Sequence, residues 1–113
     1  MNIELIQTIL SNFAKERDWE RFHSPKNLSM ALVGEAAELL ETFQWLTEQQ
    51  SKDIVKSEKK MAQVREEIAD VFISIIRLAD VLNVDIEKSV IDKMAINAKK
   101  YPIETSKGNT EKH

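Results

Sequence analysis

The 113-residue sequence contains no cysteine and only two glycines and two prolines. Without cysteine, the chain can form neither a disulfide nor a thiolate metal site. The scarcity of glycine and proline, beside abundant Ala, Leu, Ile, Glu and Lys, disfavours a β-sandwich or an open α/β sheet and predicts an all-α protein. Because the two glycines, Gly34 and Gly108, lie far apart, a glycine-rich phosphate-binding loop is excluded.

Long apolar runs and an excess of basic residues are missing as well. No apolar run approaches the ~20 residues of a membrane-spanning helix, and the amino terminus lacks a signal-peptide pattern. The formal net charge of −3 argues against binding to a nucleic-acid backbone. We therefore expect a soluble, cytoplasmic protein with no membrane and no nucleic-acid partner.

Apolar residues recur at helical spacing in four segments, which are residues 2–17, 25–46, 57–82 and 86–101. Ser24 followed by Pro25 is a start signal for the second helix, and Asp85 is the expected cap of the fourth. Residues 18–23 are expected to form a loop rich in aromatic residues, and residues 47–57 a loop or a short helical turn.

The second half of the third helix, residues 71–82, is apolar almost all round. A helix without a polar face lies in the centre of a bundle or in a subunit interface. The pattern predicts a four-helix bundle that is completed by oligomerisation, as a dimer or tetramer. Residues 1–103 are expected to form a single domain, and residues 104–113 a disordered tail without an apolar pattern.

Two acidic motifs lie on the second and third helices, namely Glu35 with Glu38 and Glu67 with Asp70. A three-residue step leaves two side chains about 60° apart on one helix face, so each motif presents a pair of carboxylates. Glu38 lies on the shoulder of the apolar stripe of the second helix, and Glu35 falls inside it. That stripe consists of Leu28, Leu32, Leu39, Phe43 and Leu46.

On the third helix, Glu67 is expected to flank the apolar stripe, and Asp70 to lie well round towards the opposite face. The stripe there consists of Met61, Val64, Ile68, Val71, Ile75 and Leu82. Burying several carboxylates together is unfavourable unless their pKa values rise or a cation lies among them. Because no Lys or Arg lies on the Glu35 stripe, a metal ion is the natural partner.

Carboxylate oxygens suit Mg²⁺, which binds few protein ligands together with waters and substrate phosphates. Zinc prefers His or Cys, of which the chain has only His23 and His113, and the Glu-x-x-His pairs of a di-iron centre are missing. The alternative is that the acids form an ordinary solvated helix face. The pairing of two motifs and the apolar surroundings of Glu35 favour a metal site.

Three aromatic residues, Trp19, Phe22 and Trp45, are candidates for stacking on a nucleobase. For Phe22 we favour core packing, whereas Trp45, on the Glu38 side of its helix, better suits a pocket.

Polar candidates lie on the fourth helix, where Lys93, Asn97 and Lys100 follow helical spacing and could reach phosphates. Alternatively, Lys99 and Lys100 only complement the negative end of the helix dipole. For His23, a role as a polar loop residue is favoured over a contact with a base.

Several segments together carry a resemblance to a known family, and they are residues 13–23, 27–28, 32–39, 43–45, 66–71 and 99–102. They resemble the all-α MazG-like nucleoside triphosphate pyrophosphohydrolases, and above all their small dCTP pyrophosphatase branch. The resemblance covers nearly the whole chain. It implies Mg²⁺-dependent hydrolysis of a (d)NTP to the (d)NMP and pyrophosphate, with Mn²⁺ as a substitute ion.

The resemblance also implies a homo-oligomer, a role in nucleotide-pool sanitation and dCTP or a related or modified dNTP as substrate. It implies that the metal ligands are Glu35, Glu38, Glu67 and Asp70. It further implies substrate contacts by Trp19, His23, Trp45, Lys93, Asn97 and Tyr101. Ser74 departs from the pattern, because relatives of this branch can carry an aromatic residue there, which leaves the base preference open.

In the reaction that this predicts, either Glu35 or Glu38 accepts the proton of the attacking water. Two other interpretations stay open, a non-catalytic helical interaction module and a hydrolase of another phosphoanhydride.

Overall fold

The computed structural model describes residues 1–108, and within them the regular structure is entirely helical. Its helices are α1 Ile3–Glu16, η1 Glu20–Phe22, α2 Pro25–Glu41, α3 Glu48–Asp53, η2 Ile54–Lys56, α4 Glu58–Val81, α5 Ile86–Lys100 and α6 Ile103–Ser106. The all-α prediction is confirmed, and the four predicted helices correspond to α1, α2, α4 and α5. None of the helices in this described part is long and apolar enough to cross a membrane.

The chain forms two compact units, Met1–Asn83 and Val84–His113. The division falls directly after Asn83, whose backbone adopts a positive φ of 56° at the end of α4. The predicted single domain over residues 1–103 spans both units and stays a prediction. The one-turn helix α6 occupies the start of the predicted disordered tail, while residues 109–113 lie outside the described residues.

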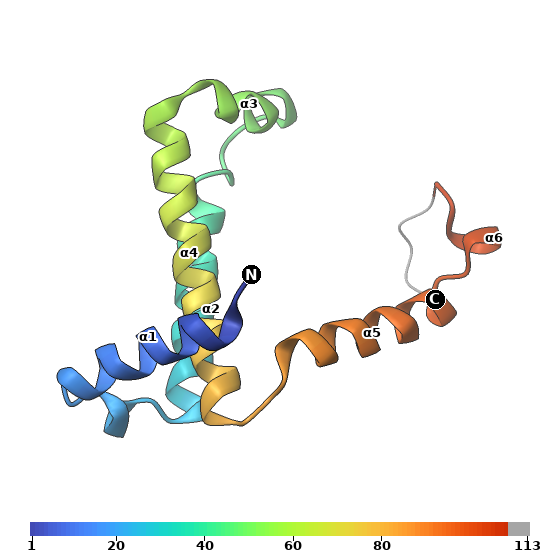
Figure 1. Cartoon of the computed structure of the whole chain (residues 1–113). Coiled ribbons are helices and arrows are strands. Elements are labelled where there is room, and N and C mark those ends of the chain that lie inside the picture. Colours follow the sequence, from blue (N-terminus) through green and yellow to red (C-terminus); the bar gives the residue numbers. More distant parts are fainter. Residues whose placement is uncertain (109–113) are drawn as a thin grey trace. The chain divides into compact units, whose positions relative to one another are not determined.

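The first unit is built on the pair α2 and α4. These helices lie side by side and run in opposite directions, joined at one end through α3 and η2 (Figure 1). Helix α1 packs against α4 as well. The buried apolar side chains come from α1, α2, η2 and α4 and are Ala14, Leu28, Ile54, Val64, Ile76 and Ala79.

Side-chain caps fix where the main helices begin. The Ser24 hydroxyl accepts a hydrogen bond of 3.1 Å from the Asn27 N–H, with Pro25 at the first helical position. Ser57 caps α4 in the same way, and Asp85 caps α5. The predicted helix starts are confirmed, because each cap satisfies one of the unpaired N–H groups of the first turn.

Helix α2 ends at Glu41, about one turn before the predicted end at residue 46. The Thr42 hydroxyl donates a hydrogen bond of 2.6 Å to the Leu39 carbonyl, and residues 42–46 continue as hydrogen-bonded turns. The prediction was wrong here because apolar periodicity persists through the turns. Trp45 therefore lies in a turn that follows the helix rather than in the helix itself.

Residues 47–57, predicted as a loop or a short helical turn, form α3 and η2. The start of α3 is a capping box, in which the Thr47 side chain accepts from the Gln50 N–H while the Gln50 side chain accepts from the Thr47 N–H. The segment predicted as a loop over residues 18–23 contains the short helix η1.

The buried face of α4 differs from the predicted one. Ile68, Ile75 and Leu82, assigned to the core by periodicity, are 42%, 36% and 50% exposed. Val64, a member of the predicted stripe, is buried, and the other buried residues of α4 are Ser74, Ile76, Arg77 and Ala79. The prediction was wrong for Ile68, Ile75 and Leu82, because a helix that is apolar almost all round does not show by periodicity which face is buried.

Candidate metal centre

The packing of α2 against α4 brings the two acidic motifs together. Each of the four acids, Glu35, Glu38, Glu67 and Asp70, offers one carboxylate oxygen, and these four oxygens all lie within 4.8 Å of one another. Glu38 is exposed, and the other three side chains are half-buried. Two i, i+3 pairs on neighbouring antiparallel helices thus form one cluster.

Asp70 corrects the sequence-based interpretation. We predicted that it lies well round towards the face of the helix opposite the apolar stripe, but it is half-buried and belongs to the cluster. The error follows from the misplaced apolar stripe of α4. The face of α4 that packs in the first unit includes Glu67, Asp70 and Ser74, so the acids lie on the buried side.

The crowding of acids changes how two of them ionise. Burial raises the pKa of Glu35, and the charges of Glu38, Asp70 and Glu67 raise it further. Burial also raises the pKa of Glu67, followed by the charge of Glu38 and a hydrogen bond with it. Both effects disfavour the charged form. The ion pairs found within residues 1–108 include none of the four acids, so no basic side chain offsets this repulsion.

Two carboxylate oxygens test whether a cation fits. Glu35 Oε2 and Glu67 Oε2 are buried and have no hydrogen-bond partner within the described residues. Buried polar atoms are almost always paired, and an unpaired anionic oxygen is among the costliest exceptions. A hard divalent cation would satisfy both oxygens, since oxygen ligands are what Mg²⁺ and Mn²⁺ prefer. The residues present therefore fit such an ion.

The aromatic segment after α1 is held at its first residue. The ring of Trp19 meets that of Phe13 edge to face, with centroids 5.7 Å apart. The Trp19 N–H donates a hydrogen bond of 2.9 Å to the Ala14 carbonyl. Asp18 makes this turn possible with a positive φ of 53°. Trp19 remains 45% exposed and can offer part of its surface to a ligand.

His23 has a partner that the sequence-based interpretation missed. Its Nδ1 accepts a hydrogen bond of 3.1 Å from Nε of Arg77, and Arg77 Nη1 donates to Asp80 Oδ2 at 3.4 Å. Burial and the Arg77 charge lower the pKa of His23, while Glu20 opposes them. The ring is therefore neutral at neutral pH, with its proton on Nε2. The sequence signal that could have indicated this contact is the presence of two charged residues, Arg77 and Asp80, in an otherwise apolar run.

Three further residues considered in the sequence analysis, Trp45, Phe22 and Ser74, belong to the first unit and differ in exposure. Trp45 is 85% exposed. Phe22 is 54% exposed, so its predicted core packing is wrong within this unit; the Arg21 guanidinium lies 4.8 Å from its ring centroid instead. Ser74 is buried on α4, one turn beyond Asp70. Its small side chain leaves more room there than an aromatic residue would.

Lys93, Asn97 and Tyr101 belong to the second unit, where the first two lie on α5 and Tyr101 follows its last residue. The Tyr101 N–H donates a hydrogen bond of 2.8 Å to the Asn97 carbonyl. The Lys100 ammonium lies 5.6 Å from the centroid of the Tyr101 ring. Lys93, Asn97 and Tyr101 follow one another at steps of four residues, from the middle of α5 to its C-terminal end, and their contacts with phosphates stay a prediction.

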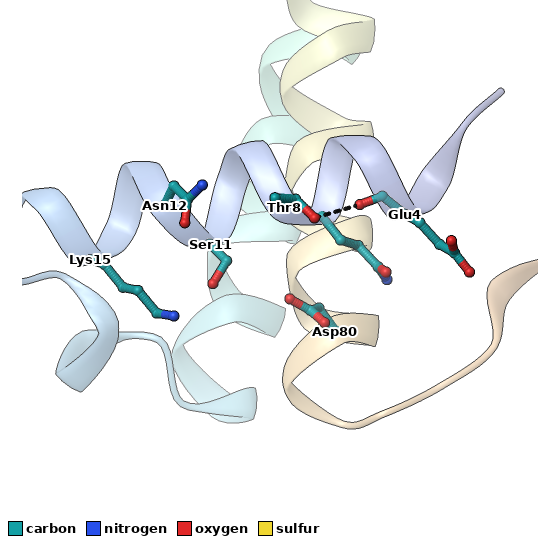
Figure 2. Close-up of a pocket in the computed structure, with 7 residues that line it drawn as sticks. Glu4, Thr8, Ser11, Asn12, Lys15 and Asp80 are labelled. Carbon is teal, nitrogen blue, oxygen red and sulfur yellow. Dashed lines mark hydrogen bonds between the residues drawn. The ribbon is translucent and has the colours of Figure 1, made fainter.

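A polar groove of about 390 Å³ lies between α1 and the C-terminal part of α4 (Figure 2). Its lining residues are Glu4, Gln7, Thr8, Ser11, Asn12, Lys15 and Asp80. None of the four clustered acids lines this groove, and it has no apolar wall that could receive a base. We therefore place the candidate site at the carboxylate cluster rather than at the groove.

Comparison with known proteins agrees with this geometry. Residues 31–113 match the model of the MazG-like family. The chain is 41% identical over 111 residues to dCTP pyrophosphatase 1 of Rattus norvegicus and 40% identical to that of Homo sapiens. Each match covers 98% of this chain and 65% of the relative, so the chain spans about two thirds of their length. The chain belongs to the MazG-like family.

A solved structure supports the same fold. The crystal structure of a pyrophosphatase from Archaeoglobus fulgidus aligns with a TM-score of 0.83 and 38% sequence identity. The alignment covers 90% of this chain and 94% of that protein. The all-α MazG-like architecture predicted from the sequence is thereby confirmed.

The carboxylate cluster predicts an unusual dependence of stability on pH. A group whose folded-state pKa is raised stabilises the fold when protonated, and that contribution is lost as pH rises through the folded-state value. For Glu35 and Glu67 this window lies above their ordinary pKa of 4.5. In metal-free protein, the double variant Glu35→Gln/Glu67→Gln should therefore be more stable than the wild type near pH 7.5, and the difference should shrink towards pH 5.

Urea denaturation at several pH values and one protein concentration measures this difference. The matched control is Glu48→Gln/Glu58→Gln, which neutralises two exposed acids outside the cluster. A cluster variant that is less stable than the wild type near pH 7.5 would show that the carboxylates do not repel one another in the folded protein.

Proposed function

We propose that this chain is a metal-dependent nucleoside triphosphate pyrophosphohydrolase that converts a (d)NTP and water into the (d)NMP and pyrophosphate. The observation that carries this proposal is the cluster of four carboxylates with two buried, unpaired oxygens. Relatives named dCTP pyrophosphatase 1 support dCTP, or a related or modified dNTP, as the substrate. We place this activity in nucleotide-pool sanitation in the cytoplasm.

The metal would be Mg²⁺, with Mn²⁺ as a substitute, and Glu35, Glu38, Glu67 and Asp70 would hold it. When bound, such an ion would neutralise charge on phosphate oxygens and orient the attacking water. The oxygen pair of α2 and that of α4 would keep the ion between the two helices. Holding it there requires no rearrangement of the backbone, since the carboxylates already converge.

Glu38 suits the role of general base better than Glu35. It is the exposed member of the cluster, so a water can approach it, whereas Glu35 is half-buried with one unpaired oxygen directed inwards. In the hydrolysis, the water oxygen forms a new bond to phosphorus and its proton passes to Glu38. The anhydride bond between the α- and β-phosphates breaks, and pyrophosphate leaves with the bonding electrons.

The nucleoside end of the substrate would be read by aromatic and polar side chains. The exposed faces of Trp19 and Trp45 offer stacking surfaces, and His23 offers the N–H of Nε2. Lys93, Asn97 and Tyr101 would approach the phosphates, Lys93 supplying positive charge and the other two supplying hydrogen bonds.

Product analysis over a panel of nucleotides tests this function. With Mg²⁺, the wild type should release pyrophosphate and the monophosphate from dCTP or a related dNTP. Glu35→Gln, Glu38→Gln, Glu67→Gln and Asp70→Asn should each lower kcat/KM by at least about a hundredfold, because each removes a ligand or the base. The control Glu58→Gln, which changes an exposed acid of α4 outside the cluster, should retain activity.

Two other results would replace the proposal. Hydrolysis of a dinucleotide but of no nucleoside triphosphate would favour another phosphoanhydride as substrate. No hydrolysis of any nucleotide, with folded protein and bound metal, would favour a non-catalytic helical module.

Substitutions at the two ends of the substrate should behave differently. Trp45→Ala should raise KM and flatten the preference among dCTP, dTTP, dATP and dGTP, because stacking depends on the base. Lys93→Ala should lower kcat/KM by a similar factor for all four, because it acts on phosphate charge that they share. An equal loss for all four nucleotides in Trp45→Ala would instead mark Trp45 as packing that holds the turn after α2.

A homo-oligomer, a dimer or tetramer, is expected from the exposed side of α4. This side carries Ile68, Phe72, Ile75 and Leu82, each at least 36% exposed and all within about 80° of one another around the helix axis. An apolar surface of this extent is rarely left open to water. Light scattering at micromolar concentration should return a multiple of 13.0 kDa. An active protein that scatters as a monomer would contradict this expectation.

A further inference from the structure

Arg77 is a buried charge inside the apolar run of α4. Its side chain is 9% exposed, and a guanidinium in such a place requires partners for its donors. Asp80 supplies the opposite charge, at 3.4 Å from Nη1 and one turn further along the helix. The second partner is His23, whose Nδ1 accepts from Arg77 Nε at 3.1 Å. Asp80 therefore orients the guanidinium, and the guanidinium orients His23.

The hydrogen bond to His23 joins residues 54 positions apart in the sequence. It ties the end of the segment Trp19–His23 to α4, whereas the start of that segment is tied to α1 through the Trp19 N–H and the Ala14 carbonyl. Within the segment the backbone bonds are local, such as that from the His23 N–H to the Glu20 carbonyl. The Phe22 carbonyl also accepts a hydrogen bond of 3.0 Å from Asn27 Nδ2 of α2. The end of the segment is thus held to α2 through its backbone and to α4 through the ring of His23.

The position of Arg77 on α4 links this contact to the metal centre. Glu67, Asp70, Ser74 and Arg77 follow one another at steps of three, four and three residues, so they share one side of the helix. All four are buried or half-buried. Arg77 lies seven residues beyond Asp70, which is about 10 Å along the helix axis. The side of α4 that carries metal ligands therefore continues into the residue that holds His23.

Asp80, the acidic partner of Arg77, also lines the polar groove next to α1. Figure 2 shows its carboxylate on the wall of the polar groove, beneath Thr8 and Ser11 of α1. Asp80 thus lies where α1 and α4 meet. Its side chain is 36% exposed, whereas the side chain of Arg77, its partner in the ion pair, is 9% exposed. The charge of Arg77 is balanced at the end of the helix away from the four acids.

We propose that Arg77 is a positioning residue for the nucleotide pocket, which holds His23 and the segment Trp19–His23 in place beside the metal-binding side of α4. This inference rests on the proposed function, in which Trp19 and His23 contact the substrate. Because Nδ1 of His23 is occupied by Arg77, the ring keeps its proton on Nε2 and presents that N–H to a polar atom of the base. Arg77 itself touches neither the substrate nor the metal.

The tautomer of His23 tests the contact without any activity measurement. In ¹⁵N-histidine-labelled protein above pH 7, two-bond ¹H–¹⁵N spectra should show the Nε2–H tautomer for His23. The second histidine, His113, is assigned by His113→Ala. In Arg77→Met the His23 signals should shift towards a mixture of both tautomers, because Nδ1 loses its donor. An unchanged pure tautomer in Arg77→Met would overturn the inference.

Steady-state kinetics with dCTP and Mg²⁺ tests the positioning role. Arg77→Met and His23→Phe should each raise KM about tenfold, with kcat changed by less than about threefold. The double variant should be no worse than the poorer single variant, because both substitutions break one contact. Mg²⁺ affinity should stay unchanged in all three. Arg65→Met, which replaces an exposed arginine of the same helix, is the control and should match the wild type.

Additive losses in the double variant, or a fall in kcat together with weaker Mg²⁺ binding, would overturn the positioning role. If Arg77→Met does not fold, His23→Phe carries the test alone, since it changes a half-buried residue, and an unchanged KM overturns the inference. A wild-type protein that hydrolyses no nucleoside triphosphate overturns the proposed function and this inference with it. A failed tautomer or kinetic test in an active enzyme overturns the inference alone.

Discussion

Repulsion among four carboxylates is the constraint on which the rest of this structure depends. Packing α2 against α4 places one oxygen of each acid within 4.8 Å of the others and buries two oxygens without a partner. The apolar side chains that lie on both helices must hold this pair together against that repulsion. A divalent cation bound there would reverse the sign of the interaction, because four mutually repelling groups would become ligands of one ion. In the proposed function, metal binding would therefore stabilise the first unit.

The buried charge of Arg77 is stabilised in a different way. Arg77 is compensated within the protein, by Asp80 on its own helix and by the ring of His23 from the aromatic segment. The acids of the cluster have no such partners among the described residues. One side of α4 thus carries a site with unsatisfied charge, suited to a ligand, followed by a charge whose partners are already in place. The carboxylate cluster is therefore suited to binding a ligand, whereas Arg77 is suited to holding neighbouring side chains in place.

Much of this was predictable from local sequence, and the remainder was not for identifiable reasons. Spacing alone paired Glu35 with Glu38 and Glu67 with Asp70, since helical rotation is fixed. Ser24 and Asp85 marked helix starts because capping is a local interaction. Periodicity failed on α4, where apolar residues on nearly every side left the buried face undetermined, and this misplaced Asp70.

Other features depended on contacts between distant segments. The bond between His23 and Arg77 spans 54 positions, so no local pattern could reveal it, although two charged residues in an apolar run were a signal. The capping box of α3 was present in the sequence as Thr47 and Gln50, but the polar composition of residues 47–57 concealed it. The turns after α2 were missed because the apolar spacing continues through Phe43 and Leu46.

The central claim is that the four carboxylates form one divalent-cation site, and calorimetric titration of metal-free protein with Mg²⁺ tests it most directly. The wild type should bind Mg²⁺ in the micromolar-to-millimolar range, and Glu35→Gln/Glu38→Gln should show no binding heat, because the pair from α2 is gone. The control Glu48→Gln/Glu58→Gln, with the same loss of charge outside the cluster, should bind as the wild type does. Equal binding by all three proteins would contradict the claim, since the ion would then be held elsewhere.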